Sequence, residues 1–167
     1  MRESPIASRK LPIAIGNSRY AKKWINKEVE WDALCEQLKV PKRTTETVLE
    51  YAKASKQIRD GIKDVGGFVT GHLHGGRRKS DTIAYMSMLK LDADEAAKDF
   101  IARFDAAHRY ECFVYSTHSH TPDAPRYRVL IPLTRNVTPE EFAAISRYVA
   151  NEYGIDSSIP ARTFRIS

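Results

Sequence analysis

The chain has 167 residues, 42% of them hydrophobic and 29% charged, which is the length and composition of one globular domain with its own core. No apolar run approaches the ~20 residues of a membrane helix, and no signal-peptide apolar region follows the N-terminus, so we expect a cytoplasmic protein without a membrane partner. The two cysteines, Cys35 and Cys112, are far apart and lack a Cys-x-x-Cys spacing, which excludes a disulfide scaffold and a zinc ribbon.

The net charge of +6 is unevenly distributed. Residues 1–80 carry 17 lysines and arginines against 9 acids, whereas residues 81–167 carry 10 against 12. A basic first half beside a mildly acidic second half is typical of a surface that binds a polyanion next to a metal site. It is also typical of a solvated surface without any partner, and charge alone leaves both interpretations open.

The first 80 residues predict short elements. An apolar run at 11–15 ends at Gly16-Asn17, which indicates a strand and a turn. Apolar residues at near-helical spacing predict one helix over about 29–38, ending before Pro41, and further helix from Thr44 or Thr45 to about Val65. Large aromatic residues are usually buried, so Trp24 and Trp31 are interpreted as packing anchors. We therefore expect residues 1–80 to form a basic, mainly helical accessory layer.

A glycine pair at Gly66-Gly67 interrupts the helical pattern, and a strand is expected over 68–73. The segment 75–80 is then a flexible turn with three cations, Arg77, Arg78 and Lys79, which we predict to contact DNA. An exposed hairpin tip with solubilising charges is the alternative. The pair His72-x-His74 has the spacing of metal ligands but lacks further ligands nearby.

The second half, residues 81–167, gives a clearer order of elements. Thr138-Pro-Glu-Glu141 has the capping-box pattern with proline at the first helical position, which marks a helix start that Gly154 would end. The predicted series is a strand at 83–91, a helix at 96–104, strands at 111–116 and 127–133, a helix from 139 and a strand at 162–166. This β-α-β-β-α-β string predicts an α+β fold with a ferredoxin-like, RRM-like antiparallel sheet as the core.

The strand at 83–91 runs directly into two acids, Asp92 and Asp94. Side chains two apart on a strand project from one side, so the two carboxylates would repel each other unless a divalent cation lay between them. Mg²⁺ typically takes one or two carboxylates and completes its coordination with water and phosphate oxygens. The alternative is that the acids cap the following helix, because aspartate is a favoured N-cap.

The predicted topology places the polar groups of the second half on one rim of the sheet. The first and second strands run one way and the third and fourth the other, so the ends of the first two strands meet the starts of the last two. The residues expected on this rim are Asp92, Asp94, Ser116, His118, His120, Arg126, Arg128, Asp156, Arg162 and Arg165.

Carboxylates facing several cations suggest phosphoryl or nucleotidyl transfer. The acids would hold one or two Mg²⁺ or Mn²⁺ ions about 4 Å apart, bridging the attacking and leaving oxygens. The arginines and a histidine would hold the triphosphate, because the guanidinium fork matches phosphate oxygens. The alternative for Arg126 and Arg128 is a solvated face of the sheet.

Several segments together resemble a known family. They are Trp31-Asp-Ala-Leu, Ile62-Lys-Asp-Val-Gly-Gly-Phe68, Gly75-Gly-Arg-Arg-Lys79, Ser87-Met-Leu-Lys-Leu-Asp-Ala-Asp94, Tyr115-Ser-Thr-His-Ser-His-Thr-Pro122 and Pro125-Arg-Tyr-Arg-Val-Leu-Ile-Pro-Leu133. In these segments the chain resembles the archaeo-eukaryotic primase superfamily, in the branch of primase-polymerases found in phages and mobile elements beside virulence-associated E-type proteins.

The resemblance implies roles for individual residues. The family's acidic pair matches Asp92 and Asp94, and its Ser-x-His motif matches Ser116-Thr-His118, with His120 as an alternative histidine. Its third acid, a further metal ligand and catalytic residue, matches Asp156, and Arg162 or Arg165 would be the basic residue that follows.

The resemblance also implies an activity, which is template-directed joining of nucleotides, either NTP or dNTP, on single-stranded DNA with Mg²⁺ or Mn²⁺. Primers would be initiated, extended or both. Larger members of the family continue into a helicase domain, so a replicative helicase is expected as a partner, either in trans or in a longer polypeptide.

Two other functions remain open. His118-Ser-His120 resembles the His-x-His pair of rolling-circle nickases, in which a tyrosine on a helix is the nucleophile, and Tyr148 and Tyr153 are the candidates here. The middle residue in those nickases is usually hydrophobic and lies within a strand, whereas here it is serine in a polar link. The other alternative is a catalytically inactive module that binds single-stranded DNA or a replication partner through the basic first half.

Overall fold

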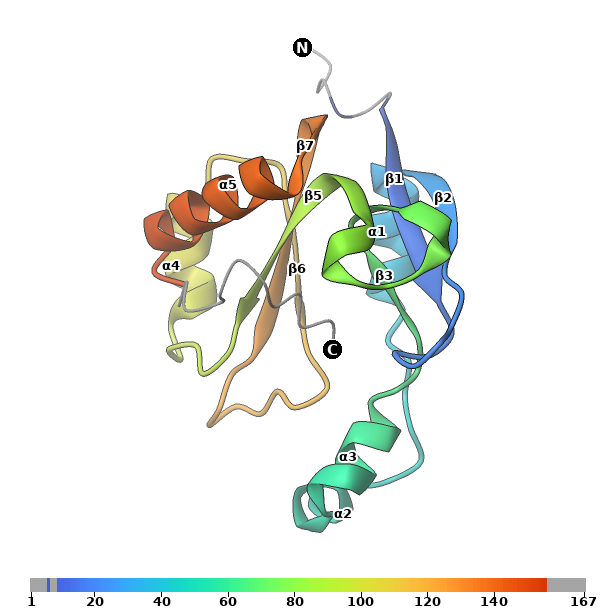
Figure 1. Cartoon of the computed structure of the whole chain (residues 1–167). Helices are drawn as coiled ribbons and strands as arrows, with labels where there is room; N and C mark the ends of the chain where they lie inside the picture. Colours follow the sequence, from blue (N-terminus) through green and yellow to red (C-terminus); the bar gives the residue numbers. More distant parts are fainter. Residues whose placement is uncertain (1–5, 7–8, 156–167) are drawn as a thin grey trace.

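The computed structural model describes residue 6 and residues 9–155. The described chain is arranged in three layers (Figure 1). Helices α4 (Phe100–Ala107) and α5 (Pro139–Glu152) form one outer layer, a four-stranded sheet lies in the middle, and a three-stranded sheet with helix α1 (Trp31–Lys39) forms the other outer layer.

The three-stranded sheet has the order β2-β1-β3 and is antiparallel throughout. Its central strand β1 (Lys10–Gly16) is almost entirely buried, with Leu11 and Ala14 fully inaccessible to solvent. Strand β2 (Ile25–Glu30) is a polar edge strand, and β3 (Gly67–Val69) pairs with the end of β1.

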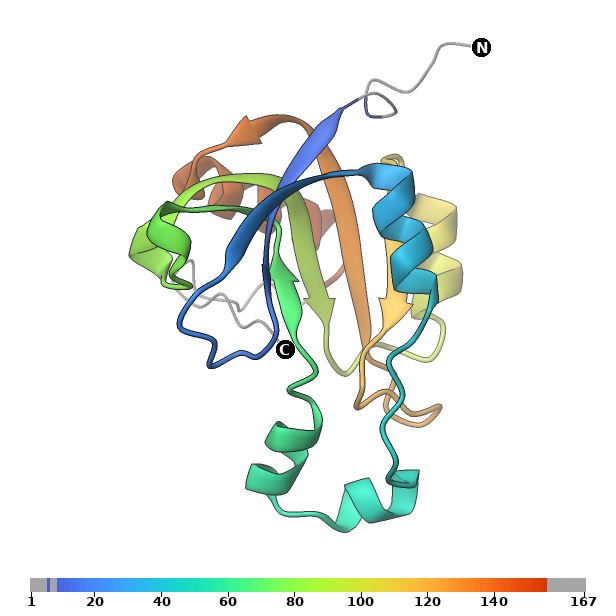
Figure 2. The ribbon, with the colours of Figure 1, turned by 90° about the vertical axis from the view of Figure 1, so that its right-hand side faces the viewer.

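The four-stranded sheet has the order β4-β5-β7-β6 and is curled into a half-barrel (Figure 2). Strands β5 (Ile83–Ala93) and β7 (Tyr127–Val137) are its long central pair, with β4 (Gly71–Leu73) and β6 (Phe113–Ser116) at the edges. All neighbours are antiparallel, so β5 and β6 run in the same direction and β7 in the opposite one. The end of β5 therefore lies beside the start of β7 and the end of β6.

Both faces of this sheet are covered, and each face supplies a core. On one face, Leu89, Leu91 and Val129 pack in a cluster that includes Phe100 of α4 and Phe142 of α5. On the other face, a smaller cluster joins the sheet to β1 and α1; its buried members are Ile6, Leu11, Ile13, Trp31, Leu34, Met88 and Leu130. Burial on both sides explains why β5 and β7 are nearly continuous apolar runs in their middle.

Two sets of hydrogen bonds join the two sheets. The Ser87 hydroxyl of β5 donates to the Pro12 carbonyl oxygen of β1 at 2.6 Å, in a fully buried position. The Asn26 side chain of β2 both accepts from the Leu73 amide (3.0 Å) and donates to the Leu73 carbonyl oxygen (2.9 Å) of β4. Because these bonds satisfy buried polar groups, they fix the position of one sheet on the other.

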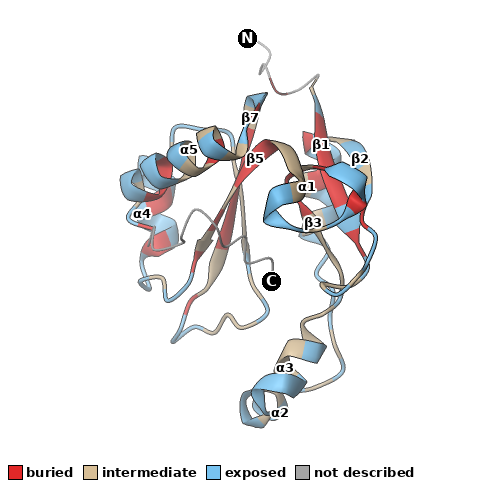
Figure 3. Cartoon of the chain, in the orientation of Figure 1, coloured by how far each residue is buried: buried red, intermediate tan, exposed pale blue. Residues whose placement is uncertain are grey.

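Residues 40–66 form an arm that projects from the sheets (Figures 1 and 2). It holds two short helices, α2 (Val48–Lys53) and α3 (Lys56–Ile62), and neither contributes a buried residue (Figure 3). Each begins at a side-chain cap, Thr47 for α2 and Ser55 for α3. Val48, Leu49 and Ile58 remain exposed on this arm.

The described part of the first half differs from the mainly helical layer expected for residues 1–80. It contributes β1, β2, β3 and β4, and its helices are short. The helix predicted over about 29–38 is confirmed as α1, which begins two residues later, at Trp31. Val29 and Glu30 instead end the edge strand β2, which pairs with β1 from Lys10 to Ile15. The strand expected at 68–73 is split at Thr70, where the chain passes from one sheet to the other. Trp24 and Trp31 are buried packing residues, as predicted.

In the second half, the strands and helices predicted up to residue 154 are confirmed, with shifts of a few residues at their ends. The predicted last strand at 162–166 lies outside the described residues. The edge of the sheet next to β5 carries β4, from the first half. The chain is therefore a mixed α+β structure with two antiparallel sheets, and the full ferredoxin-like plan stays a prediction. No helix among the described residues is long and apolar enough to cross a membrane.

Candidate active site

The end of β5 and the start of β7 carry an acid–base pair on directly opposite positions. Asp92 is the register partner of Arg128, and the Arg128 Nε donates to Asp92 Oδ1 at 2.6 Å. The two side chains are 18% and 9% exposed, so this pair is largely removed from water. Opposite residues of an antiparallel pair point to the same face, which explains why both groups meet here.

A second acid–base pair follows one step further along the same face. The register continues through Ala93 and Tyr127, and beyond it the Arg126 Nη1 donates to Asp94 Oδ1 at 3.1 Å. These side chains are 31% and 61% exposed, so the second pair lies in water. The two carboxylates and two guanidinium groups thus form a charge-balanced cluster at the end of the sheet.

The alternative in which the acid pair caps the next helix is wrong. Helix α4 begins at Phe100 and its N-cap residue is Asp99. Between the strand and that helix the chain turns at Glu95, whose φ of 58° is in the left-handed region. The Ala96 amide donates to the Pro125 carbonyl oxygen at 3.0 Å, which ties this turn to the start of β7.

Two further polar residues share the face of the buried pair. Lys90 lies two positions before Asp92, and Tyr115 of β6 is the register partner of Arg128. The guanidinium carbon of Arg128 lies 5.9 Å from the centre of the Tyr115 ring. On the same face Met88 and Leu130 belong to the core shared with β1 and α1, so the polar groups extend the buried layer toward the rim.

Burial and charge shift the titration of these groups. Burial opposes the charge of Arg128, but Asp92 and the Tyr115 hydroxyl outweigh it and raise the pKa of the guanidinium. Burial, together with the Arg128 charge, lowers the pKa of Lys90 to about 7. Burial also raises the pKa of Tyr115. Adding a further cation beside Asp92 is therefore unfavourable unless an anion binds with it.

The donor chemistry of the described residues fits a hard cation only in part. No group of three or more histidine, cysteine, aspartate or glutamate side chains is gathered in the part of the chain that the structure describes. Asp92 and Asp94 supply two carboxylates. Mg²⁺ commonly binds one or two protein carboxylates when phosphate oxygens and water complete its coordination. The third predicted acid, Asp156, and the predicted basic residues Arg162 and Arg165 lie outside the described residues.

The two candidate histidines have different surroundings. His120 accepts the Arg126 backbone amide on Nδ1 at 3.1 Å, so the proton of the neutral ring is on Nε2. Its ring also lies 5.0 Å from that of Tyr127. These contacts make His120 part of the structure of the loop between β6 and β7.

His118 faces the arm instead. Its Nε2 lies 3.3 Å from the Thr44 hydroxyl oxygen and 3.6 Å from Glu46 Oε1, and its ring centre is 4.6 Å from that of Tyr51. The Tyr51 hydroxyl lies 3.2 Å from the Ser119 hydroxyl. The Thr44 hydroxyl donates to Glu46, and this bond is the main cause that lowers the pKa of Glu46. The Glu46 carboxylate thus faces the imidazole of His118, the residue predicted from the sequence to contact the triphosphate.

Ser116 ends β6 opposite Tyr127 and is exposed.

The three cations of the predicted DNA contact differ in exposure. Arg77 and Lys79 are exposed, whereas Arg78 is half-buried, with its guanidinium carbon 5.1 Å from the centre of the Trp24 ring and its Nη1 bonded to the Arg19 carbonyl oxygen. Arg78 therefore also stabilises the fold.

The two tyrosines considered as nickase nucleophiles lie on or just after α5. That helix covers the face of the sheet opposite to the one that carries Asp92 and Arg128. Tyr148 is exposed, and Tyr153 packs on Phe104 while its hydroxyl accepts the Arg109 amide at 3.2 Å.

Sequence reasoning missed three residues of this site, Lys90, Tyr115 and Glu46. The alternation that groups Asp92 with Asp94 also includes Lys90, so this residue was detectable. Tyr115 directly precedes the predicted Ser-x-His motif, but its partner Arg128 depends on the strand register. Glu46 is far from His118 in the sequence, and no local pattern indicates their contact.

A scan against protein families matches residues 6–165 to the VapE N-terminal domain. The chain belongs to the VapE N-terminal domain family. The match spans both sheets, the arm and the acid–base cluster, and it agrees with the predicted relation to virulence-associated E proteins of phages and plasmids. Comparisons with curated proteins and with solved structures find no match.

Proposed function

We propose that this VapE N-terminal domain is the catalytic domain of a DNA primase-polymerase of the archaeo-eukaryotic primase superfamily. It would join NTP or dNTP units on a single-stranded DNA template with Mg²⁺ or Mn²⁺, in phage or mobile-element replication. The RRM-like plan predicted for residues 81–167 is part of this proposal, and the strand order β5-β7-β6 of the described residues supports it.

The observation that carries the proposal is the double acid–base pair at the rim. A metal-bound triphosphate brings both a cation and an anion, so it can replace both partners of each pair together. Asp92 and Asp94 would exchange guanidinium for the metal, while Arg128 and Arg126 would exchange carboxylate for phosphate oxygens. After the exchange each charged side chain still lies opposite a group of opposite charge, which matters because the Asp92–Arg128 pair is largely buried.

The other residues have roles consistent with this exchange. Lys90 lies on the same face, where an added phosphate would favour its charged form. His118 would contact the triphosphate, with Ser116 near the same rim, while His120 holds the loop. The ion held by Asp92, Asp94 and Asp156 would activate a 3′-hydroxyl and stabilise the charge that develops on the phosphate.

The partners follow from the same proposal. The template would be single-stranded DNA, with Arg77 and Lys79 among its contacts. Arg162 and Arg165 are proposed as further triphosphate contacts. A replicative helicase, in trans or in a longer polypeptide, would supply the unwound strand.

The test is nucleotide incorporation on single-stranded DNA, primed and unprimed, with Mg²⁺ or Mn²⁺. Wild type should incorporate nucleotides, and Asp92→Ala and Asp94→Ala should each lose at least about 100-fold in rate, since each removes a metal ligand. Asp94 is the safer variant because its carboxylate is 61% exposed, so its loss does not leave a buried charge. Asp99→Ala, which removes an exposed ion pair with Arg103, is the matched control.

Other outcomes would point to other functions. Wild-type incorporation by Asp94→Ala would contradict the assignment of Asp94 as a metal ligand of the polymerase site. DNA binding without metal-dependent incorporation would favour an inactive binding module. A covalent phosphotyrosyl–DNA adduct, lost in Tyr148→Phe, would favour a nickase.

A further inference from the structure

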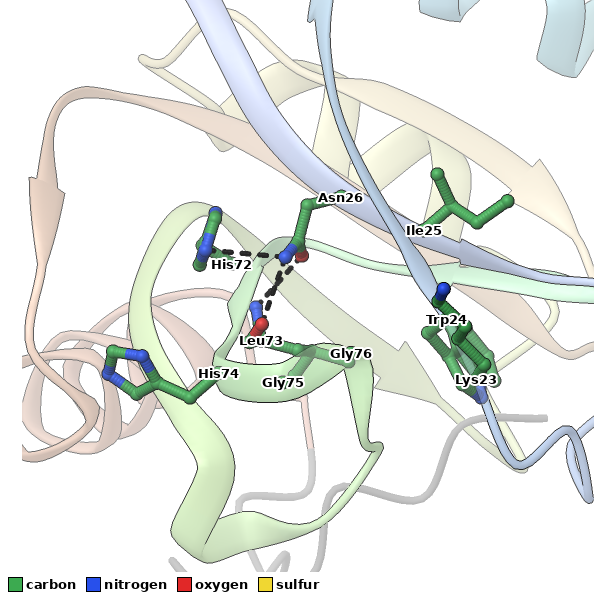
Figure 4. Close-up of a pocket in the computed structure, with 9 residues that line it drawn as sticks. All are labelled: Lys23, Trp24, Ile25, Asn26, His72, Leu73, His74, Gly75 and Gly76. Atoms are coloured by element: carbon green, nitrogen blue, oxygen red, sulfur yellow. Dashed lines mark hydrogen bonds between the residues drawn. The ribbon is translucent and has the colours of Figure 1, made fainter.

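A hollow of about 700 Å³ lies beside β4 (Figure 4). Because β4 pairs with the start of β5, the hollow is at the opposite end of β5 from Asp92. It is lined by residues of two segments, 23–26 and 72–76, and includes none of the groups placed in the candidate active site. Its position is fixed by the pairing of His72 with Tyr85 near the start of β5. Asp92 lies seven positions after Tyr85, which is about 23 Å along the strand at ~3.3 Å per residue.

The walls of this hollow are held by bonds from both sheets. Asn26 makes its two bonds with the Leu73 backbone, as described above, and the Trp24 amide donates to the Gly76 carbonyl oxygen at 2.7 Å. Gly76 has a φ of +63°, and a Cβ there would lie 2.5 Å from the Trp24 carbonyl oxygen. A site whose walls are fixed in this way is preorganised for a ligand.

The bonds of Asn26 also determine the tautomer of His72. Because Asn26 Oδ1 accepts the Leu73 amide, its Nδ2 must be the atom that lies 3.2 Å from His72 Nε2. An amide nitrogen only donates, so Nε2 accepts and the hydrogen of the neutral ring is on Nδ1. None of the described residues accepts that hydrogen in a bond, and the ring stacks on Tyr85 with centres 5.3 Å apart.

The hollow offers further donors and a cation but no carboxylate. Lys23 and His74 are exposed, and within the described chain neither makes an ion pair or a side-chain hydrogen bond. The indole Nε1 of Trp24 is buried without a partner among the same residues. None of the lining residues is acidic. The exposed cation Arg77 follows Gly76 directly in the chain, and the exposed Lys79 lies two positions after Arg77.

Aromatic rings beside cations, without acids, are the features that bind nucleotides of a single strand, where bases stack and phosphates need positive charge. We propose that this hollow binds one nucleotide unit of a single-stranded nucleic acid. Its base packs against the His72 ring, and the phosphates on its two sides lie at Lys23 and at His74, which flank the hollow (Figure 4). This site would hold the template strand away from the acid–base cluster. It rests on the proposed function because the bound strand is taken to be the template of the proposed polymerase.

The test measures binding of a fluorescent oligothymidylate of about 20 nucleotides, longer than the ~16 nucleotides that one single-strand-binding fold covers. Lys23→Ala should weaken binding several-fold and lower the slope of log affinity against log salt by about 1, because one phosphate contact is lost. His74→Ala should weaken binding about fivefold, because a hydrogen bond to a phosphate is lost. Lys22→Ala removes a neighbouring exposed lysine outside the hollow and should leave both quantities unchanged.

Three results would overturn the proposal. The first is an equal effect of Lys22→Ala and Lys23→Ala, which would mean a general charge effect. The second is wild-type affinity and salt slope in both Lys23→Ala and His74→Gln, the latter being a conservative second variant. The third is loss of free dNTP binding in Lys23→Ala with unchanged oligonucleotide binding, which would make the ligand a free nucleotide.

The failure of this site and of the proposed function can be told apart. If incorporation is absent or insensitive to Asp94→Ala while Lys23→Ala still weakens oligonucleotide binding, the catalytic assignment fails and the hollow stands. If incorporation depends on Asp94 but binding ignores Lys23 and His74, the hollow fails alone.

Discussion

At the scale of single residues, the two acid–base pairs differ in burial, and burial decides their energetic role. Arg128 and Asp92 are mostly removed from water, so the loss of one partner leaves the other as an uncompensated buried charge. Asp94 is exposed and Arg126 is partly exposed, and ion pairs that remain in contact with water contribute little to stability.

This contrast predicts the stability of matched variants. Arg128→Met should lower the free energy of unfolding by about 3 kcal/mol, whereas Arg126→Met should change it by less than about 1 kcal/mol. Urea unfolding of both variants measures the difference. Equal losses would contradict the burial of the first pair.

The contact between Glu46 and His118 gives a second prediction. If His118 binds the triphosphate, Glu46 and Thr44 orient its ring, and Glu46→Ala should lower incorporation by about tenfold, in the range seen for partners of ligand residues. The ring ¹⁵N shifts of His118 should change in the same variant. Glu28→Ala, an exposed acid on β2, is the control and should leave both readouts unchanged.

At the scale of elements, β5 organises the molecule. It pairs with β4 at its start and with β7 along its length, and one of its faces carries both apolar core residues and the groups Lys90 and Asp92. Because successive residues alternate between faces, the strand carries the acid pair to the rim while its other face packs on α4 and α5.

The lowered pKa of Lys90 predicts a pH dependence with a definite sign. Between about pH 7 and the ordinary lysine value of 10.5, the unfolded chain holds a proton on Lys90 that the folded chain has lost. The free energy of unfolding should therefore rise with pH through this window. Relative to Lys90→Met, wild type should gain roughly 1–2 kcal/mol between pH 7 and pH 9, measured by urea unfolding. A constant difference between the two proteins would contradict this environment for Lys90.

The turn after β4 gives a test of local geometry. Gly75 and Gly76 share a φ of +63°, but a Cβ on Gly75 meets nothing within 4 Å, whereas one on Gly76 meets the Trp24 carbonyl oxygen. Gly75→Ala should lower the free energy of unfolding by about 1 kcal/mol, for backbone strain alone. Gly76→Ala should lose at least about 1 kcal/mol more, for the added clash. Melting temperatures of the two variants compare them, and identical shifts would contradict the close approach.

The accuracy of the sequence predictions varies with how local their signals are. The strands around Leu89 and Val129 and the helix from Pro139 were predictable, because long apolar runs and a capping box are local signals. The edge strand β2 has the polar sequence Ile-Asn-Lys-Glu-Val-Glu, which carries no local strand signal, and it forms through its pairing with β1. In the arm, the sequence predicts one continuous helix, whereas the structure has two, the second capped by Ser55. Within the described part of the chain, Val48, Leu49 and Ile58 of this arm stay exposed.

At the scale of the whole molecule, the site depends on contacts between distant segments. Alternation and topology placed Asp92, Arg126 and Arg128 on one rim from the sequence, and the register of β5 and β7 has them there. That the acids and arginines pair with each other, and that the arm reaches His118, depends on packing between segments far apart in the chain. The hollow beside His72 likewise needs β2 and β4 of different sheets.

The central claim is that the rim exchanges its two acid–base pairs for a metal-bound triphosphate. The most direct measurement is a crystal structure with a nucleoside triphosphate and Mn²⁺, with the metal located by its anomalous signal. The account predicts Mn²⁺ coordinated by carboxylate oxygens of Asp92 and Asp94, with Arg126 and Arg128 moved from the carboxylates to the phosphates. A nucleotide bound elsewhere, with the Asp92–Arg128 bond intact and no metal at either aspartate, would contradict it.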